Sequence, residues 1–123
     1  MKGEAYLQAN CVKWFDLRYP ALSPLLFAVP NGGWRNKIEA VNLKRQGVKP
    51  GVSDLILLFP RKGHGALLIE MKYGKGRQRD AQKRWQQTVE AAGYRYVVCR
   101  TFDAFKEEVD RYLGIDNEQS VGR

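Results

Sequence analysis

Residues 53–72, "SDLILLFPRKGHGALLIEMK", restrict what this chain can fold into more than any other stretch. Two apolar runs, Leu55–Phe59 and Ala66–Ile69, flank a short loop rich in glycine and positive charge. Apolar runs of this length on either side of a glycine-containing turn are typical of two antiparallel strands joined as a hairpin. The stretch therefore predicts a hairpin whose body is buried in a sheet.

The open end of this hairpin has a charged composition that burial does not explain. A turn centred near residues 62–63 places Asp54 opposite residues 70–72, because opposed positions in an antiparallel pair have a constant sum. Strand alternation puts Glu70 and Lys72 on one face and the residue between them on the other. Two carboxylates and one ammonium group therefore converge at one end of the hairpin.

The residues alone leave two interpretations of this convergence open. Two close carboxylates repel each other unless a cation lies between them, and Mg²⁺ accepts such oxygen ligands while keeping several waters. A neighbouring lysine, here Lys72, can then orient the attacking water. The alternative is a cross-strand ion pair of Lys72 with Asp54 or Glu70, which contributes little to stability at a surface.

The predicted helix over residues 4–18 has two polar side chains on its apolar stripe. Glu4 and Gln8 lie on that stripe at 100° per residue, although polar groups normally avoid a buried face. A polar active-site pocket would supply partners for them, whereas the alternative is that Glu4 lies in solvent where the helix begins. The apolar members of the stripe are Leu7, Cys11, Trp14 and Phe15.

A helix predicted near residues 79–92 shows the same mixture. Gln82 and Gln86 share its stripe with Trp85 and Val89. Buried amides need hydrogen-bond partners, which a polar active-site pocket would provide. The alternative is that both glutamines lie at the edge of the stripe.

The other predicted elements complete an α/β pattern. Ile38, Val41 and Leu43 are expected to provide the apolar contacts of the second helix, and Gly47 to end it. The order α-β-α-β-β-α-β-α predicts a single α/β domain over residues 1–113, with a small mixed β-sheet flanked by helices, and a polar tail over residues 114–123. These elements are a strand over 25–29, a helix over 35–46, a strand over 94–99 and a helix over 102–113.

Positive charge is unevenly distributed along the chain. The net charge is +8, and residues 72–84 contain six basic side chains against one acidic, whereas residues 102–118 contain six acidic side chains against two basic. A uniform solubilising surface would not separate the signs in this way. The pattern predicts a polyanionic partner on one side of the fold, with nucleic acid ahead of an anionic membrane.

Several function classes are not expected. The longest apolar runs have about five residues, too few to span a bilayer, and the N-terminal stretch has no apolar signal-peptide core. Cys11 and Cys99, without a CxxC spacing, predict buried thiols of an intracellular protein that is not secreted. One histidine, His64 in the predicted turn, and two distant cysteines do not make a zinc site.

Several blocks of the sequence together resemble a known nuclease family. "GVSD" (51–54) followed by "IEMK" (69–72) resembles the divided motif of the PD-(D/E)xK superfamily, with Ser53 where the motif's name has proline. The wider pattern resembles the VRR-NUC domain over residues 4 to about 113. Its further blocks are Glu4 with Gln8, "PNGG" with Arg35, "KPGVSDLIL", and Gln82 with Trp85 and "AAGYRYVV".

The resemblance implies a restriction-endonuclease-like core and a Mg²⁺- or Mn²⁺-dependent phosphodiesterase acting on DNA. It implies Asp54, Glu70 and the backbone carbonyl of Met71 as metal ligands, and Lys72 as the motif lysine. Glu4 and Gln82 match further active-site positions, and Gln8 and Gln86 would support them. Stand-alone members, from bacteria and phages, resemble Holliday-junction resolvases and tend to be homodimers, so this chain is expected to be a cytoplasmic protein of that type.

DNA is expected to dock on basic residues around this site, because phosphate contacts provide affinity with little sequence information. A non-catalytic DNA-binding module and a nuclease for RNA or for nicked or flapped DNA remain as alternatives. The expected phosphate contacts are Arg35, Lys44, Arg45, Lys49, Lys75, Arg77 and Arg79.

Overall fold

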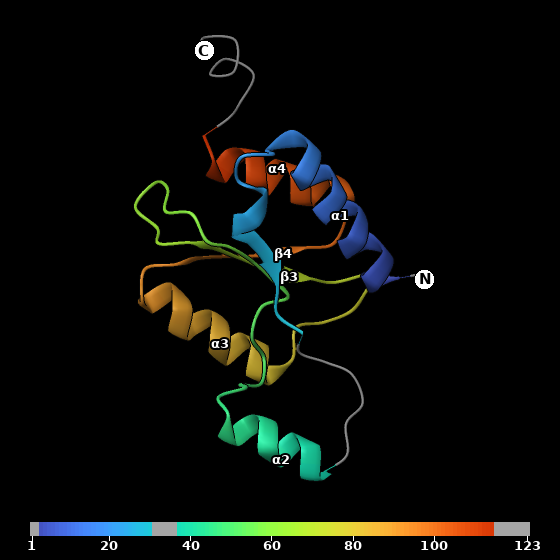
Figure 1. Cartoon of the computed structure of the whole chain (residues 1–123), viewed down its shortest axis with the longest axis vertical. Coiled ribbons are helices and arrows are strands. Elements are labelled where there is room, and N and C mark those ends of the chain that lie inside the picture. Colours follow the sequence, from blue (N-terminus) through green and yellow to red (C-terminus); the bar gives the residue numbers. More distant parts are fainter. Residues whose placement is uncertain (1–2, 31–36, 115–123) are drawn as a thin grey trace.

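The computed structural model describes residues 3–30 and 37–114, which form four helices, one 3₁₀ turn and four strands (Figure 1). The first half contains α1 (Glu4–Arg18), η1 (Ser23–Leu25), β1 (Leu26–Ala28), α2 (Lys37–Arg45) and β2 (Leu55–Leu57). The second half contains β3 (Leu67–Met71), α3 (Asp80–Ala91), β4 (Arg95–Cys99) and α4 (Phe102–Tyr112). The predicted α/β class and order of elements are confirmed, with strand and helix ends shifted by at most two residues where the structure describes them. The predicted start of the second helix, at residue 35, lies outside the described residues.

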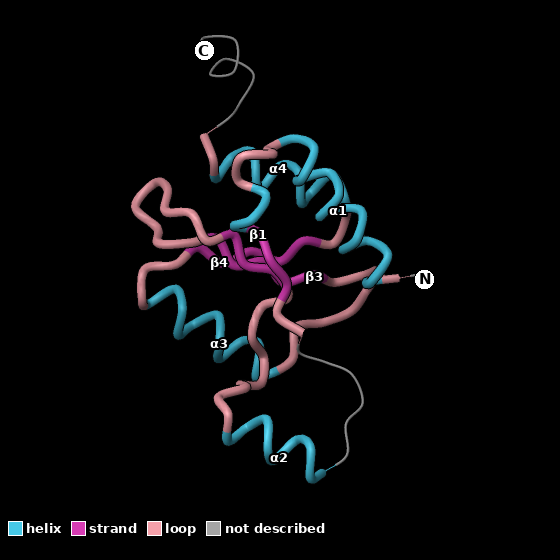
Figure 2. Tube along the Cα trace, in the orientation of Figure 1, coloured by secondary structure: helices cyan, strands magenta, loops and turns pink. Residues whose placement is uncertain are grey.

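The four strands form one mixed sheet in the order β1-β2-β3-β4. Figure 2 shows this sheet in magenta between the helices. β1 pairs with β2 and β2 pairs with β3 in antiparallel fashion, whereas β3 and β4 are parallel. Parallel neighbours need a long crossover connection, and α3 provides it between β3 and β4. The small mixed sheet expected from the sequence is therefore confirmed.

The β2–β3 hairpin has the register that the sequence predicted. Leu55 lies opposite Ile69, and a two-residue turn joins the extensions of the strands at Lys62 and Gly63. Both turn residues have positive φ, 52° and 81°, as in the turn type whose twist matches that of paired strands. Continuing the register by one residue brings Asp54 beside Glu70.

Helices cover both faces of the sheet, with α1 and α4 on one face and α3 on the other (Figure 1). The predicted stripe of α1 is confirmed, because Cys11 and Phe15 are fully buried and Leu7 and Trp14 pack against them. Alternate residues of β3 face the α1–α4 core, which leaves the residues between them, including Glu70, for the α3 face. The core residues on the α1–α4 side include Phe15, Leu55, Leu57, Ile69, Met71, Phe105 and Val109.

The expected packing of α2 is wrong. Ile38 is 76% exposed and Val41 is 54% exposed, and only Leu43 of the three predicted contacts is half-buried. Figure 1 shows the reason, because α2 lies beyond α3 and covers neither face of the sheet. An apolar spacing on a helix predicts burial only if the fold brings a second surface to it.

The expectations for the cysteines, for membrane spans and for the domain boundary have different outcomes. Cys11 and Cys99 are buried free thiols as predicted, and burial raises the pKa of each to about 12. Within residues 3–30 and 37–114, no helix is long and apolar enough to cross a membrane. The expected boundary at residue 114 stays a prediction, because residues 115–123 lie outside the described part of the chain.

Candidate active site

Two carboxylates meet where β2 begins and β3 ends. Asp54 directly precedes β2, and its Oδ2 accepts a hydrogen bond of 2.7 Å from the backbone N–H of Met71. Glu70, in β3, is only 1% exposed, whereas Asp54 is half-buried. The strands thus bring together the two acidic residues that the sequence singled out, and the hydrogen bond to Met71 orients the Asp54 side chain.

The two oxygens of Glu70 have different surroundings. Oε2 accepts a hydrogen bond of 2.7 Å from Nε2 of Gln82 and lies 3.8 Å from Nζ of Lys72. Oε1 is buried and has no hydrogen-bond partner among the described residues. A buried carboxylate oxygen without a partner is costly, so this atom is where a cation would be most favourable.

Electrostatics at Glu70 favour its protonated form in the metal-free protein. Burial and the charge of Asp54 raise the pKa of Glu70 to about 8, and the charge of Glu4 adds to the effect. Lys72, which is 8% exposed, acts in the opposite direction but does not offset burial. A bound dication would replace that proton and relieve the repulsion between the carboxylates.

Gln82 is held in one orientation by two hydrogen bonds. It is 4% exposed in the first turn of α3, and its Oε1 accepts a hydrogen bond of 2.7 Å from the backbone N–H of Arg79. Its Nε2 is therefore directed to Glu70 rather than away from it. The predicted placement of Gln82 beside the carboxylates agrees with these contacts.

Gln86 has other partners than Glu70. Its Oε1 accepts a hydrogen bond of 2.9 Å from Gln78, which also donates to the Tyr96 hydroxyl, and its Nε2 donates to Glu90. The two glutamines that share a stripe on α3 therefore have different environments. Gln82 contacts Glu70, whereas Gln86 belongs to a polar cluster with Gln78, Tyr96 and Glu90. The expectation that Gln86 supports the site directly finds no contact among the described residues.

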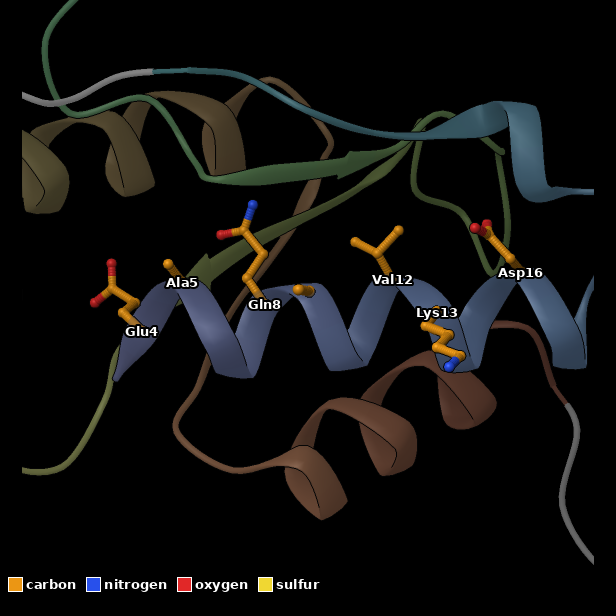
Figure 3. A pocket seen from close by; sticks show the side chains of 7 residues that line it. Glu4, Ala5, Gln8, Val12, Lys13 and Asp16 are labelled. Atoms are coloured by element: carbon orange, nitrogen blue, oxygen red, sulfur yellow. The ribbon is translucent and has the colours of Figure 1, made fainter. Parts of the chain in front are cut away.

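Glu4 and Gln8 line an open groove along α1. Figure 3 shows both side chains on the same side of the helix as Val12 and Asp16. Glu4 is exposed, and its effect on the pKa of Glu70 is electrostatic. The structure thus places Glu4 near the site without a direct contact to Asp54 or Glu70 among the described residues.

The segment before Asp54 packs tightly against α3. Gly51 has φ 78°, and a Cβ at this position would lie 2.5 Å from the backbone of Ala81. Ser53 is fully buried and accepts a hydrogen bond of 2.9 Å from Nε1 of Trp85. Neither contact is predicted from the sequence, although a glycine such as the one in "KPGVSD" often marks a place where two backbone segments approach closely.

The basic residues predicted to contact DNA are exposed where the structure describes them. Three lie on the loop directly after Lys72, which Arg100 ties down by donating to the carbonyls of Gly74 and Gly76, at 3.2 and 2.6 Å. Arg35 lies outside the described residues. The exposed ones are Lys75, Arg77 and Arg79 on this loop, and Lys44, Arg45 and Lys49 in and after α2.

The donor set fits one hard divalent cation. Within residues 3–30 and 37–114, no group of three or more His, Cys, Asp or Glu side chains is placed to hold a metal ion, so the protein offers two carboxylates and main-chain oxygens. Mg²⁺ commonly binds through one or two carboxylates and fills its other positions with waters and substrate phosphate. The side chain of Met71 is fully buried in the core, so only its backbone could join them.

The metal-free protein should lose stability as pH rises from about 4.5 towards about 8. Folded Glu70 keeps its proton in this range, whereas the unfolded chain releases it near the ordinary value of 4.5, so rising pH favours unfolding. Glu70→Gln cannot ionise, and its free energy of unfolding relative to wild type should increase across this window. Urea denaturation with a chelator measures this, and a constant difference from about pH 5 to about pH 9 contradicts the assignment.

Gly51→Ala should destabilise the protein more than Gly47→Ala. Both glycines have positive φ, 78° and 103°, so both substitutions cost about 1 kcal/mol in backbone strain. Only the Cβ at residue 51 would collide with α3, because nothing lies within 4 Å at residue 47. Equal losses in the free energy of unfolding would contradict close packing at Gly51.

Comparison with known proteins agrees with this geometry. Residues 2–103 match the VRR-NUC domain family. A solved structure described as a VRR_NUC domain protein superposes with a TM-score of 0.81 at 26% sequence identity, over 94% of this chain and 91% of the other. None of the curated proteins compared with the chain matches it. The chain belongs to the VRR-NUC domain family, and its fold is that of a nuclease-type domain.

Proposed function

We propose that this protein is an endonuclease that hydrolyses DNA phosphodiester bonds with Mg²⁺ or Mn²⁺ at Asp54, Glu70 and the backbone carbonyl of Met71. One observation supports the metal above all others. In the described part of the chain, the buried Oε1 of Glu70 has no hydrogen-bond partner and lies beside a second carboxylate, which is a costly arrangement for a protein that binds no cation. Membership of a nuclease family makes phosphodiester hydrolysis the reaction to expect there.

The protein's own groups suggest how the reaction is assisted. The metal ion, when bound, would supply Lewis-acid stabilisation of charge on the phosphate and lower the pKa of a bound water. Lys72 would orient the attacking water near phosphorus, and its position 3.8 Å from Glu70 is compatible with this role. Gln82 keeps Glu70 in place, and Glu4 adds negative charge at the edge of the site.

Phosphates would approach over the basic loop that follows Lys72. Lys75, Arg77 and Arg79 form no ion pair within the described part of the chain, so their charge is available to a polyanion. By contrast, acidic residues of α4, on the opposite side of the sheet, are paired with arginines, as in Arg95–Glu108 at 3.4 Å. Lys44, Arg45, Lys49 and Arg35 would extend the contact.

We further propose that the substrate is branched DNA and that two copies of the chain act together. A four-way junction has two symmetric strands, so cutting both needs two sites related by a twofold axis. Free buried thiols agree with a protein that works inside the cell. The bacterial or phage origin that we propose rests on the resemblance to stand-alone members of the family alone.

Replacing either carboxylate should abolish cleavage and spare DNA binding. Asp54→Ala and Glu70→Gln should each lower the rate by more than about a hundredfold, because the proposed metal loses a ligand. Glu107→Gln, which removes an exposed carboxylate on α4, is the matched control and should cleave normally. Full cleavage by either site variant would exclude this assignment.

The assay should use labelled linear, nicked, flapped and four-way-junction DNA, and RNA, with Mg²⁺, Mn²⁺ or EDTA. Paired metal-dependent cuts confined to the junction, with a dimer by light scattering, are the expected result. Metal-dependent cleavage of another substrate would support the nuclease activity and contradict the preference for junctions. Tight binding without cleavage would favour a DNA-binding module.

Neutralising the basic loop should weaken DNA binding for all sequences alike. Lys75→Ala and Arg77→Ala should each reduce the slope of log affinity against log salt by about 1, because each lost phosphate contact releases one counterion fewer. Lys13→Ala, on α1, removes an exposed charge elsewhere and should leave the slope unchanged. Unchanged slopes in Lys75→Ala and Arg77→Ala would place the DNA on another surface. An equal reduction in Lys13→Ala would mean that the slope depends on net charge and not on contacts with this loop.

A further inference from the structure

Ser53 is a fully buried polar residue directly before a proposed metal ligand. Its hydroxyl accepts a hydrogen bond of 2.9 Å from the indole N–H of Trp85. We infer that Ser53 and Trp85 are positioning residues, and that their hydrogen bond sets where Asp54 stands relative to Glu70. The metal part of this inference rests on the proposed function, whereas the positioning part does not need a metal.

The helix α3 would then position both carboxylates, Glu70 directly and Asp54 through Ser53. Gln82 and Trp85 are three residues apart on α3, so they lie on the same side of the helix. Gln82 donates to Glu70, and Trp85 donates to Ser53, which precedes Asp54. Because the backbone of a helix is rigid, the two hydrogen bonds fix one distance between the segments that bear the acidic groups.

Asp54 needs such support because it lies outside the paired residues of β2. Its carbonyl accepts a hydrogen bond of 2.9 Å from Val29, and its Oδ2 accepts one from Met71. The first contact comes from the residue after β1 and the second from β3, so neither connects Asp54 to a helix on a face of the sheet. The hydrogen bond from Trp85 to Ser53 comes instead from α3, which covers one face of the sheet, so it links the segment before Asp54 to that face.

The hydrogen bond to Trp85 depends on the residue type at position 53, which is serine in this chain. The motif of the superfamily has proline there, whose ring fixes φ covalently. Serine lacks that restriction, but its hydroxyl can accept a hydrogen bond, which a proline side chain cannot do. In this chain the residue before Asp54 is instead linked to α3 by a hydrogen bond.

Trp85→Phe isolates the hydrogen bond from packing. The ring of Trp85 packs against a second apolar cluster that includes Leu68 and Val89, and phenylalanine keeps most of that contact while losing the N–H. Trp14→Phe is the matched control, because Trp14 packs edge-on against Phe105 on the opposite face of the sheet. A purely structural role for Trp85 would make the two variants behave alike at the site.

The test combines a metal-free readout with metal binding. In chelator, the amide resonance of Met71, which donates to Asp54, should shift in Trp85→Phe and in Ser53→Ala but not in Trp14→Phe. Mn²⁺ binding followed by electron paramagnetic resonance should weaken about tenfold or more in the first two variants, as for other groups that orient metal ligands. The double variant should be no worse than the worse single variant, because both remove the same hydrogen bond.

The outcomes separate this inference from the proposed function. An unchanged Met71 amide in Trp85→Phe would overturn the positioning role, whatever the metal does, and Ser53→Ala decides the question if Trp85→Phe does not fold. If wild type binds no Mn²⁺, the proposed function falls while the amide shift still decides the positioning role. A shifted amide with unchanged Mn²⁺ affinity would overturn the inference that this hydrogen bond sets the geometry of the metal site.

Discussion

The proximity of two carboxylates, one of them buried, is the constraint on which the rest of the site depends. Asp54 and Glu70 repel each other, and burial raises the free energy of the charged form of Glu70, so its pKa reaches about 8 without a metal. A flexible loop would relax by moving one acid away. Here the β2–β3 register and the Met71–Asp54 hydrogen bond prevent that movement, and the repulsion stays available to favour cation binding.

The helix α3 supplies the second half of this rigidity. Its last turns pack Val89 into the apolar cluster with Tyr96, while its first turns contact the site through Gln82 and Trp85. The same helix makes the crossover that allows β3 and β4 to be parallel. Topology and site are therefore coupled, because a shift of α3 along the sheet would change both the core contacts and the hydrogen bonds to the strand ends.

Much of this could be predicted because the relevant signals are local. Alternation along a strand places Glu70 and Lys72 on one face, and a two-residue turn at residues 62–63 aligns Asp54 with them. Apolar periodicity likewise indicated the buried face of α1, where Cys11 and Phe15 lie in the core. Each of these inferences needs only the geometry of one element or of two elements joined by a short turn.

The sequence by itself thus determined the hairpin, the convergence of its charges and the buried stripe of α1. The tertiary structure alone decided which of two equivalent glutamines reaches Glu70, that Ser53 meets Trp85, and that Ile38 stays exposed. The physical reason is that periodicity specifies which side of a helix is apolar, but not where along a neighbouring surface the helix docks. That position follows from the packing of the whole sheet, which no short segment contains.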